Sequence, residues 1–373
     1  MKYYLIAGEA SGDLHGSNLI RALHRQDPHA EIRCWGGDRM QAAGATLVKH
    51  YRELSFMGFL EVLANLPKIF KNLAFCKRDI AAFQPDALIF IDFSGFNLRI
   101  ARWARKEGLR THYYISPQVW ASREGRVRKI KRDIDQMYVI LPFEKDFYEK
   151  KHGMPVHFVG HPLIDAMGHR PEPDPQGFLA AQGLDPEKPV IALLPGSRTQ
   201  EIRTVLPLML QIAPRYPEYQ FAVAGAPSQE PAFYEPFLQG TGAVLVMDQT
   251  YSLLEAAHAA LVTSGTATLE TAILKVPQVV CYKGNWISYQ IARRLITLDY
   301  ISLVNLIMGR QVVTELIQND LTPEHLGREL DAILEGPGRE RQLQAYKELG
   351  RRLGGGGASN KAAQLIVDFS KGT

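Results

Sequence analysis

Near its middle the chain reads Val190-Ile-Ala-Leu-Leu-Pro-Gly-Ser-Arg-Thr-Gln-Glu201, and this stretch decides the predicted fold. It predicts a buried strand over Val190–Leu194, a turn at Pro195-Gly196 and then a helix. The first N–H groups of a helix lack partners and its dipole is positive there, so this order predicts an anion site. Gly196 lets a ligand come close, Ser197 offers a hydroxyl, and Arg198 offers a forked cation that suits phosphate. We expect a sugar-nucleotide diphosphate here; the alternative is an ordinary turn with a surface arginine.

Length and composition describe a soluble, two-domain protein. The chain has 373 residues, of which 46% are hydrophobic and 22% charged, and its formal net charge is +4. No apolar run approaches the roughly 20 residues that a membrane-spanning helix needs, and no signal-peptide cleavage pattern is present. The three cysteines (Cys34, Cys76 and Cys281) are far apart in apolar settings, which indicates reduced core residues of a cytosolic protein.

Strand-like segments alternate with helical patterns along both halves of the chain. The predicted strands are Lys2–Ala7, Glu31–Trp35, Ala87–Asp92, Arg110–Ile115, Met137–Leu141 and Val156–Val159, then Val190–Leu194, Gln220–Ala224, Ala243–Met247, Ala259–Val262 and Gln278–Tyr282. This alternation predicts an α/β protein with two doubly wound, Rossmann-like domains that face each other across a cleft.

Proline and glycine mark the predicted boundaries. The stretch Gly168–Gly177 contains three prolines and predicts an extended linker, so we expect domains at residues 1–167 and 168–353. Gly354–Gly357 cannot hold a helix, so the tail, residues 354–373, is expected to cross back to the first domain or to a partner subunit. The sequence is therefore compatible with a homodimer.

Ligands of open parallel sheets bind beyond the carboxyl ends of the strands. A second helix start lies at such an end, in Thr263-Ser-Gly-Thr-Ala-Thr-Leu-Glu270. Ser264, Gly265 and Thr266 are expected to bracket the diphosphate together with the first site, and Glu270 is placed to accept both hydroxyls of a ribose. The alternative is that Ser264 and Thr266 only cap the helix and Glu270 is a surface charge.

Asp92 ends the most apolar strand of the first half. A carboxylate at a dry cleft mouth is expected to have a raised pKa, which suits a general base. The alternative is an aspartate that caps the following helix.

Another acidic segment, Gly8-Glu-Ala-Ser-Gly-Asp13, begins a stretch that is predicted to be a loop up to Gly16. It lacks the dinucleotide fingerprint and the spacing of a nucleophile elbow. The carboxylates of this segment would repel a phosphate and suit a hydroxyl-rich sugar better. Ser11 and Asp13 are therefore expected to contact a sugar. A plain loop before a capped helix is the alternative.

Apolar residues recur at helical spacing between residues 56 and 73, followed by lysine and arginine: Phe59, Val62, Leu63, Leu66 and Phe70 lie on this stripe. A core-facing helix is the usual explanation, whereas an anionic bilayer surface is the alternative. The basic run Arg123–Arg132 is interpreted as a solvated helix face, a lipid-headgroup patch or a nucleic-acid patch. No metal is expected, because Asp133 and Asp135 do not end a strand at a cleft and His157 and His161 are separated by a turn.

Several segments together resemble lipid-A-disaccharide synthases, in that family's order and over nearly the whole chain. They are Gly8–Asp13, Phe56–Gly58, Ile91-Asp92 with Phe96-Asn97, Ser116–Ala121, Leu141–Glu144, Gly160–Pro162, Leu194–Arg198, Ser264–Glu270 and Tyr300–Asn305. Each segment is weak alone, but the ordered set is specific.

The resemblance implies a glycosyltransferase of the B-type fold that works without a cofactor or metal. Such enzymes move 2,3-diacylglucosamine from its UDP conjugate to 2,3-diacylglucosamine 1-phosphate (lipid X), giving the β-1,6 disaccharide 1-phosphate and UDP, at the cytoplasmic face of the inner membrane. The family's catalytic aspartate matches Asp92, its N-terminal loop carboxylate Glu9, its phosphate arginine Arg198 and its donor-side asparagine Asn305. Where many members carry a second acid, this chain has Gly95.

The resemblance also favours a membrane or acyl contact for the apolar stripe, since both substrates carry acyl chains. The expected partners are the two substrates and an anionic inner-membrane surface, without nucleic acid. Another UDP-sugar enzyme of this fold, such as an epimerase or a soluble-acceptor transferase, is the main alternative. A nucleic-acid-binding module built on Arg123–Arg132 would instead show salt-sensitive RNA binding without affinity for UDP.

Overall fold

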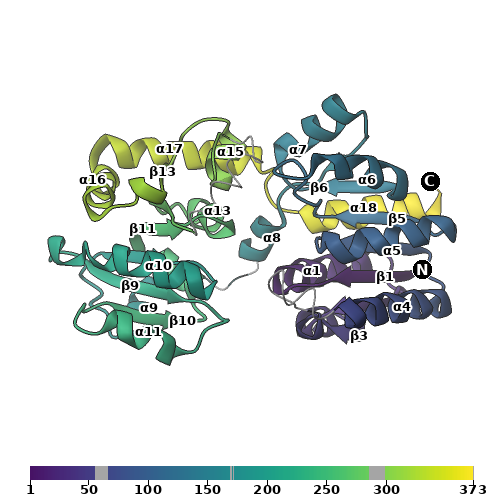
Figure 1. The fold of residues 1–373 in the computed structure, drawn as a ribbon, viewed down its shortest axis with the longest axis horizontal. Coiled ribbons are helices and arrows are strands. Elements are labelled where there is room, and N and C mark those ends of the chain that lie inside the picture. The colour runs from purple at the N-terminus through teal and green to yellow at the C-terminus, as the bar shows by residue number, and fades with distance from the viewer. Residues whose placement is uncertain (55–65, 169, 171, 285–298, 373) are drawn as a thin grey trace. The chain divides into compact units, whose positions relative to one another are not determined.

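The computed structural model describes residues 1–54, 66–168, 170, 172–284 and 299–372, which form two compact units (Figure 1). The first unit comprises Met1–Arg170 and Leu353–Thr373, and the second comprises Pro171–Arg352. The predicted Phe59, Val62 and Leu63 lie outside the described residues.

A seven-stranded parallel sheet forms the centre of the first unit, in the order β3-β2-β1-β4-β5-β6-β7. Its strands are β1 (Lys2–Ala7), β2 (Glu31–Gly36), β3 (Thr46–His50), β4 (Ala87–Ile91), β5 (Thr111–Tyr114), β6 (Gln136–Val139) and β7 (His157–Phe158). The helices are α1 (Ala10–Gln26), α2 (Asp38–Ala42), α4 (Leu66–Phe83), α5 (Ser94–Lys106), α6 (Val127–Asp133), α7 (Pro142–Asp146), α8 (Pro162–Gly168) and α18 (Ala358–Lys371), with the short 3₁₀ helices η1 (Tyr51–Glu53) and η2 (Glu124–Arg126) and the π-helix η3 (Phe147–Lys151).

The central strands are apolar on both faces because helices cover both faces. In β1, Tyr4 and Ile6 face one core, which α4 and α5 complete, whereas Leu5 and Ala7 face the other core. The period-two alternation of a strand therefore divides one apolar segment between two cores.

The last helix belongs to the first unit. Ile366 of α18 shares a core with Leu19 of α1, and α18, yellow in Figure 1, lies among the purple and blue elements of this unit. The carboxylate of Asp165 on α8 accepts hydrogen bonds from the N–H groups of Gly357 (2.5 Å) and Ser359 (2.8 Å), which start this helix. The tail thus packs on the first unit of its own chain.

The second unit has a six-stranded parallel sheet in the order β10-β9-β8-β11-β12-β13. Its strands are β8 (Val190–Leu194), β9 (Gln220–Gly225), β10 (Val244–Met247), β11 (Ala257–Thr263), β12 (Gln278–Tyr282) and β13 (Thr314–Ile317). Its helices are α9 (Pro175–Ala181), α10 (Thr199–Leu210), α11 (Pro231–Leu238), α12 (Thr250–Ala256), α13 (Thr266–Ile273), α15 (Leu303–Met308), α16 (Pro323–Leu334) and α17 (Gly336–Arg352), with short turns η4 (Ala213–Arg215) and η5 (Gln318–Asp320).

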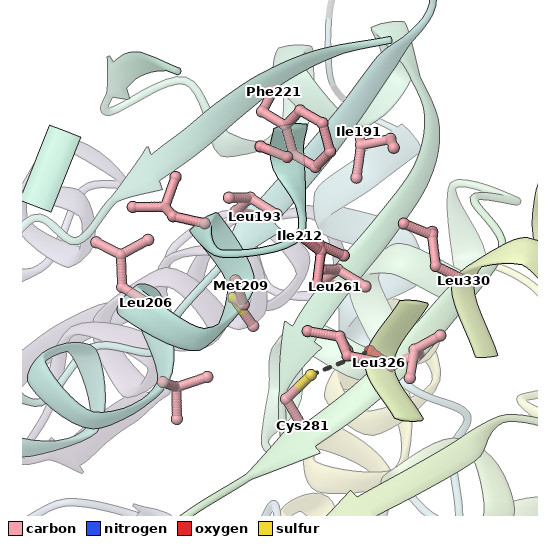
Figure 2. Packing of buried hydrophobic residues seen from close by; sticks show 14 of the residues in the cluster. Ile191, Leu193, Leu206, Met209, Ile212, Phe221, Leu261, Cys281, Leu326 and Leu330 are labelled. Carbon is pink, nitrogen blue, oxygen red and sulfur yellow. Dashed lines mark hydrogen bonds between the residues drawn. The ribbon is translucent and has the colours of Figure 1, made fainter. Parts of the chain in front are cut away.

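Figure 2 shows part of one hydrophobic core of this unit. Ile191 and Leu193 of β8 pack with Met209 of α10 and Leu330 of α16. Val190, Ala192 and Leu194 belong to the opposite core. Two parallel sheets covered on both faces confirm the predicted doubly wound α/β class. No described helix is both long and apolar enough to cross a membrane.

Four local predictions were wrong. The sheet-edge strands β3 and β13 were missed, because partly exposed edge strands carry mixed polar and apolar residues. The segment predicted as a loop up to Gly16 is helical from Ala10, since its glycines serve packing: a Cβ on Gly16 would lie 2.7 Å from the sulfur of Met40. Pro175 does not extend the linker but starts α9, whose first turn Asp174 caps.

Candidate functional site

Two carboxylates meet at the carboxyl ends of β1 and β4. These strands are neighbours, with Ala7 paired to Ile91, so the residues that follow them lie at one edge of the sheet. Glu9 follows β1, and Asp92 follows β4. Asp92 is partly buried and Glu9 is exposed, which leaves both able to meet a ligand.

The backbone at Asp92 is held in a strained turn. Asp92 and Phe93 have backbone φ angles of 43° and 46°, which residues other than glycine rarely adopt. The carbonyl oxygen of Asp92 accepts hydrogen bonds from Nδ2 of Asn97 (2.8 Å) and from the hydroxyl of Tyr113 (2.5 Å). Gly8 leaves room for the Phe93 ring, which a Cβ would approach to 2.2 Å. The surroundings thus fix a conformation that aims Asp92 beyond the strand.

Burial raises the pKa of Asp92 to about 6, and the negative charge of Glu9 adds to the rise. The pKa shift expected from the sequence is therefore present. Asp92 does not cap the next helix: Phe93 occupies the N-cap of α5, without a side-chain hydrogen bond to the helix. A carboxylate with this pKa can take a proton from a hydroxyl at neutral pH.

The other polar residues of the first acidic segment divide into two kinds. Ser11 is exposed on the first turn of α1. Asp13 is only 4% exposed, and its carboxylate accepts hydrogen bonds from the N–H groups of Gly37 (2.8 Å) and Met40 (3.0 Å) at the start of α2. The predicted sugar contact of Asp13 is thus replaced by a structural role, because its oxygens already bind backbone.

A buried glutamate to which the sequence reasoning gave no role of its own lies after β6, the strand beyond β5 in the sheet. Glu144 on α7 is 1% exposed and accepts hydrogen bonds from the hydroxyl of Ser116 (2.5 Å) and the indole of Trp120 (3.2 Å). It also accepts from the N–H of Leu141 (2.9 Å), as a glutamate in the first turn of a helix often does. Burial raises the pKa of Glu144. Glu144 therefore anchors the segment after β5, which neighbours β4.

In the second unit the two predicted helix starts lie at adjacent strand ends. β8 pairs with β11, with Leu194 opposite Val262, so α10 and α13 begin beside each other. Gly196 has a φ of 101°, and a Cβ there would lie 2.8 Å from a carboxylate oxygen of Glu201. Glycine is therefore required at this turn by conformation and by space. The structure brings together the two segments that the sequence placed at a diphosphate.

The side chain of Arg198 is available to a ligand. Its backbone forms the N-cap of α10, its side chain is 76% exposed, and its guanidinium lies 3.3 Å from Glu201. The neighbouring loop after β9 supports this turn, since the hydroxyl of Ser228 donates to the carbonyl of Ser197 (2.9 Å). Sequence reasoning missed Ser228, because no motif connects it to the glycine turn.

The second helix start combines an exposed turn with one anchored side chain. Gly265 and Thr266 are exposed, and Gly265 forms the N-cap of α13 with a φ of 155°, a conformation open to glycine. Ser264 does not cap the helix by its side chain: its hydroxyl donates to the carbonyl of Ile301 (3.0 Å). Backbone N–H groups, rather than the Ser264 hydroxyl, are thus the donors that this turn offers.

Glu270 is partly buried on α13 and accepts a hydrogen bond from the hydroxyl of Tyr251 (2.8 Å). Burial raises its pKa, whereas the hydrogen bond from Tyr251 lowers it. Glu270 is thus a largely desolvated carboxylate with a defined orientation. It is not the plain surface charge that was the alternative interpretation of the sequence.

Asn305 is committed to hydrogen bonds within the protein. It is fully buried, and its Nδ2 donates to the carbonyl of Val313 (2.9 Å) and to Glu315 (2.8 Å). Its Oδ1 accepts from the N–H groups of Val312 (2.7 Å) and Val313 (3.0 Å). The predicted direct contact of Asn305 with the donor is therefore replaced by a scaffold role, because its polar atoms are all used.

The apolar stripe is split between core and surface. Leu73 is buried in the core, whereas Phe70 is 64% exposed and Phe75 is 40% exposed on α4. Lys71 and Arg78 are exposed on the same helix. Leu66 begins α4, and its side chain lies outside the described residues. The described part of the stripe therefore combines a core face with exposed aromatic and basic residues.

Within the described ranges, no group of three or more His, Cys, Asp or Glu is arranged to hold a metal ion. Asp133 pairs with Arg132 (2.6 Å) and Asp135 with Arg105 (2.6 Å), so these two acids make ion pairs of the first unit. Gly95 is exposed, and a Cβ there would meet no atom within 4 Å. The second acid that the resemblance implies for many family members would therefore have room here, so glycine is not required at this position by space.

The sequence matches a family model described as lipid-A-disaccharide synthetase over residues 3–369. Proteins named lipid-A-disaccharide synthase from Geobacter metallireducens and Myxococcus xanthus are 41% and 39% identical to the chain. Each alignment covers 98% of this chain and 96% of the relative.

Solved structures of low sequence identity share the fold. A UDP-GlcNAc 2-epimerase from Neisseria meningitidis bound to UDP-GlcNAc superposes with a TM-score of 0.66 at 12% identity and full coverage of both chains. The glycotransferase of kitacinnamycin gives a TM-score of 0.65 at 15% identity, with 98% of each chain covered. At these identities the likeness shows the architecture alone.

Proposed function

Because the chain belongs to the lipid-A-disaccharide synthetase family, we propose that it is a lipid-A-disaccharide synthase that transfers 2,3-diacylglucosamine from its UDP conjugate to lipid X. The products are the β-1,6 disaccharide 1-phosphate and UDP. The observation that carries the chemistry is Asp92, a carboxylate of raised pKa on a strained turn at a strand end.

Asp92 acts as the general base. Its carboxylate takes the proton from the primary hydroxyl of lipid X as that oxygen attacks the anomeric carbon of the donor. A new C–O bond forms, the bond to the diphosphate breaks, and a single displacement inverts the anomeric centre. Glu9 supports the base, because its negative charge raises the pKa of Asp92 and so strengthens it as a proton acceptor.

The second unit receives the negative charge of the departing UDP. The first N–H groups of α10 and α13 lie at neighbouring strand ends, and Arg198 adds a cation beside them. Fixed donors aimed at a developing charge stabilise a transition state, because they need no reorganisation during the reaction. Glu270 binds the ribose hydroxyls, and Gly196 and Gly265 let the diphosphate approach the backbone.

A product assay tests this function directly. The purified protein, incubated with lipid X and UDP-2,3-diacylglucosamine, is expected to release UDP and form a disaccharide 1-phosphate. Deacylated donor serves as the matched substrate control and should react poorly. Release of UDP without a disaccharide would contradict the transferase reaction. Formation of a 2-epimer of the sugar nucleotide would also contradict it, and either outcome would indicate another UDP-sugar enzyme of this fold.

The pH dependence of kcat/KM should report the ionisation of Asp92. The base must be ionised, so a pKa of about 6 predicts activity that rises about tenfold per pH unit below pH 6 and levels off above it. Replacing Glu9 by glutamine removes a neighbouring negative charge, and the break should move to lower pH. Circular dichroism at each pH controls for unfolding. A break that stays in place in Glu9→Gln contradicts the coupling between the two acids.

We further propose that α4 contacts the anionic surface of the inner membrane, at its cytoplasmic face. Phe70 and Phe75 expose apolar rings on a helix that also exposes Lys71 and Arg78, a combination that suits the boundary between headgroups and acyl chains. The exposed rings are also suited to contact acyl chains of the substrates.

Vesicle sedimentation can test this surface. Phe70→Glu is expected to weaken binding to vesicles that contain anionic phospholipid by about thirtyfold or more, because it removes an apolar ring worth about 2 kcal/mol when buried and adds a negative charge. Gln26→Glu, which adds the same charge to the exposed end of α1, is the control. Unchanged vesicle binding, or a large fall in melting temperature, would show that Phe70 does not serve the membrane.

A further inference from the structure

The orientation of Glu270 depends on a residue of another helix. Tyr251 is the second residue of α12, and its hydroxyl donates to Oε1 of Glu270 at 2.8 Å. A hydrogen bond to a charged acceptor is among the stronger contacts of a protein, and it restricts the rotation of the carboxylate. One oxygen of Glu270 thus has a fixed partner before any ligand binds.

The topology explains why α12 reaches this position. β10 and β11 are parallel strands of one sheet separated by β9 and β8, so the chain must return across the sheet between them. α12 makes this crossing, and it begins three residues after β10, at the same sheet edge where α10 and α13 start. Tyr251 therefore lies at the ligand edge of the sheet, although no nucleotide-binding motif includes it.

We propose that Tyr251 is a positioning residue that fixes the Glu270 carboxylate for the two hydroxyls of the donor's ribose. This inference rests on the proposed function, in which the second unit binds a uridine diphosphate. Tyr251 does not touch the reacting atoms. It holds one carboxylate oxygen so that both oxygens lie in a plane set for a pair of adjacent hydroxyls.

Charge supports the same role. Burial disfavours the ionised form of Glu270 and raises its pKa, whereas the Tyr251 hydroxyl favours that form. Two ribose hydroxyls are donors, and an ionised carboxylate is an acceptor on both oxygens. The Tyr251 hydroxyl thus favours the ionised form of Glu270, which is the form that accepts hydrogen bonds from a ribose. Removal of this hydroxyl should therefore weaken recognition of the ribose more than binding of the rest of the nucleotide.

Binding of UDP and of 2′-deoxy-UDP to the full-length protein, measured by calorimetry, separates these contributions. The wild-type protein should prefer UDP. Tyr251→Phe keeps the ring and removes the hydroxyl, and it should weaken UDP binding about tenfold while changing 2′-deoxy-UDP binding little. In a Glu270→Gln background, Tyr251→Phe should have no further effect on the preference.

Tyr346→Phe is the matched control for a merely structural effect. It removes a buried tyrosine hydroxyl of the same unit, bonded to Gln342 on α17. It should lower stability without changing the preference for UDP. If Tyr251→Phe keeps the wild-type preference, the positioning role is overturned and the nucleotide site stands. If the wild-type protein does not bind UDP, the proposed function itself fails.

Discussion

Asp92→Asn is expected to lower kcat by about 10²–10⁴-fold, the range that a general base supplies. Asparagine has the same shape but cannot accept the proton of the attacking hydroxyl. It also tolerates the left-handed backbone at this position, where φ is 43°, better than most residues do. The turn should therefore survive the substitution, and the loss of rate should come from chemistry rather than from folding.

The decisive measurement is single-turnover transfer at saturating substrates, together with the affinity for UDP. UDP binding and the melting temperature should stay near wild type, because the donor contacts belong to the second unit. Asp146→Asn, the same change at a carboxylate whose side chain is 65% exposed, is the control and should be fully active. Normal turnover of Asp92→Asn would remove Asp92 from the mechanism, and Glu9 would then be the next candidate for the base.

Arg198→Ala is the second substitution with a large expected effect. It should lower kcat by about 10²–10³-fold, because it removes a cation aimed at the charge that develops on the leaving diphosphate. Folding should not suffer, since the side chain is 76% exposed and its ion pair among the described residues, with Glu201, lies at the surface of the same helix. Arg198→Lys should restore part of the rate, since lysine keeps the charge but lacks the fork.

The affinities for UDP and for uridine show whether Arg198 contacts the diphosphate. Arg198→Ala should bind UDP more weakly than wild type and should bind uridine equally well. Arg203→Ala, at an exposed arginine of the same helix whose guanidinium lies over the Phe233 ring, is the control and should leave both affinities unchanged. Equal losses for UDP and uridine would assign Arg198 to the fold of α10 rather than to the phosphate.

A comparison of Asn97 with Asn305 shows what a sequence motif can and cannot predict about a residue. Both residues occur in segments that resemble a known family, and both are fully buried. Asn97 supports the carbonyl of Asp92, directly behind the proposed base. Asn305 supports a turn before β13 and presents no free polar atom. A motif therefore identified residues that matter near a site, but it did not distinguish a ligand contact from a scaffold.

The same lesson holds for Asp13 and Glu144. Asp13 is in an acidic segment next to a strand end, a position that predicts a ligand contact, yet its carboxylate binds the start of α2. Glu144 lies in one of the family-like segments, but it was given no role of its own, because after Leu141-Pro142 it reads as an ordinary helix start. Its bonds to Ser116 and Trp120 join residues more than twenty positions apart, which no local pattern reveals.

Local patterns in the sequence were enough to predict the fold class, two parallel sheets and the strand ends near which Asp92, Arg198 and Glu270 lie. They were enough because apolar runs, glycine turns and helix starts are local signals, and in parallel sheets the carboxyl ends of the strands share one edge. Which polar atoms remain for a ligand became clear only from the folded structure. This depends on contacts between distant segments, such as the bond from Tyr251 to Glu270, and on burial, which sets the charge of each acid.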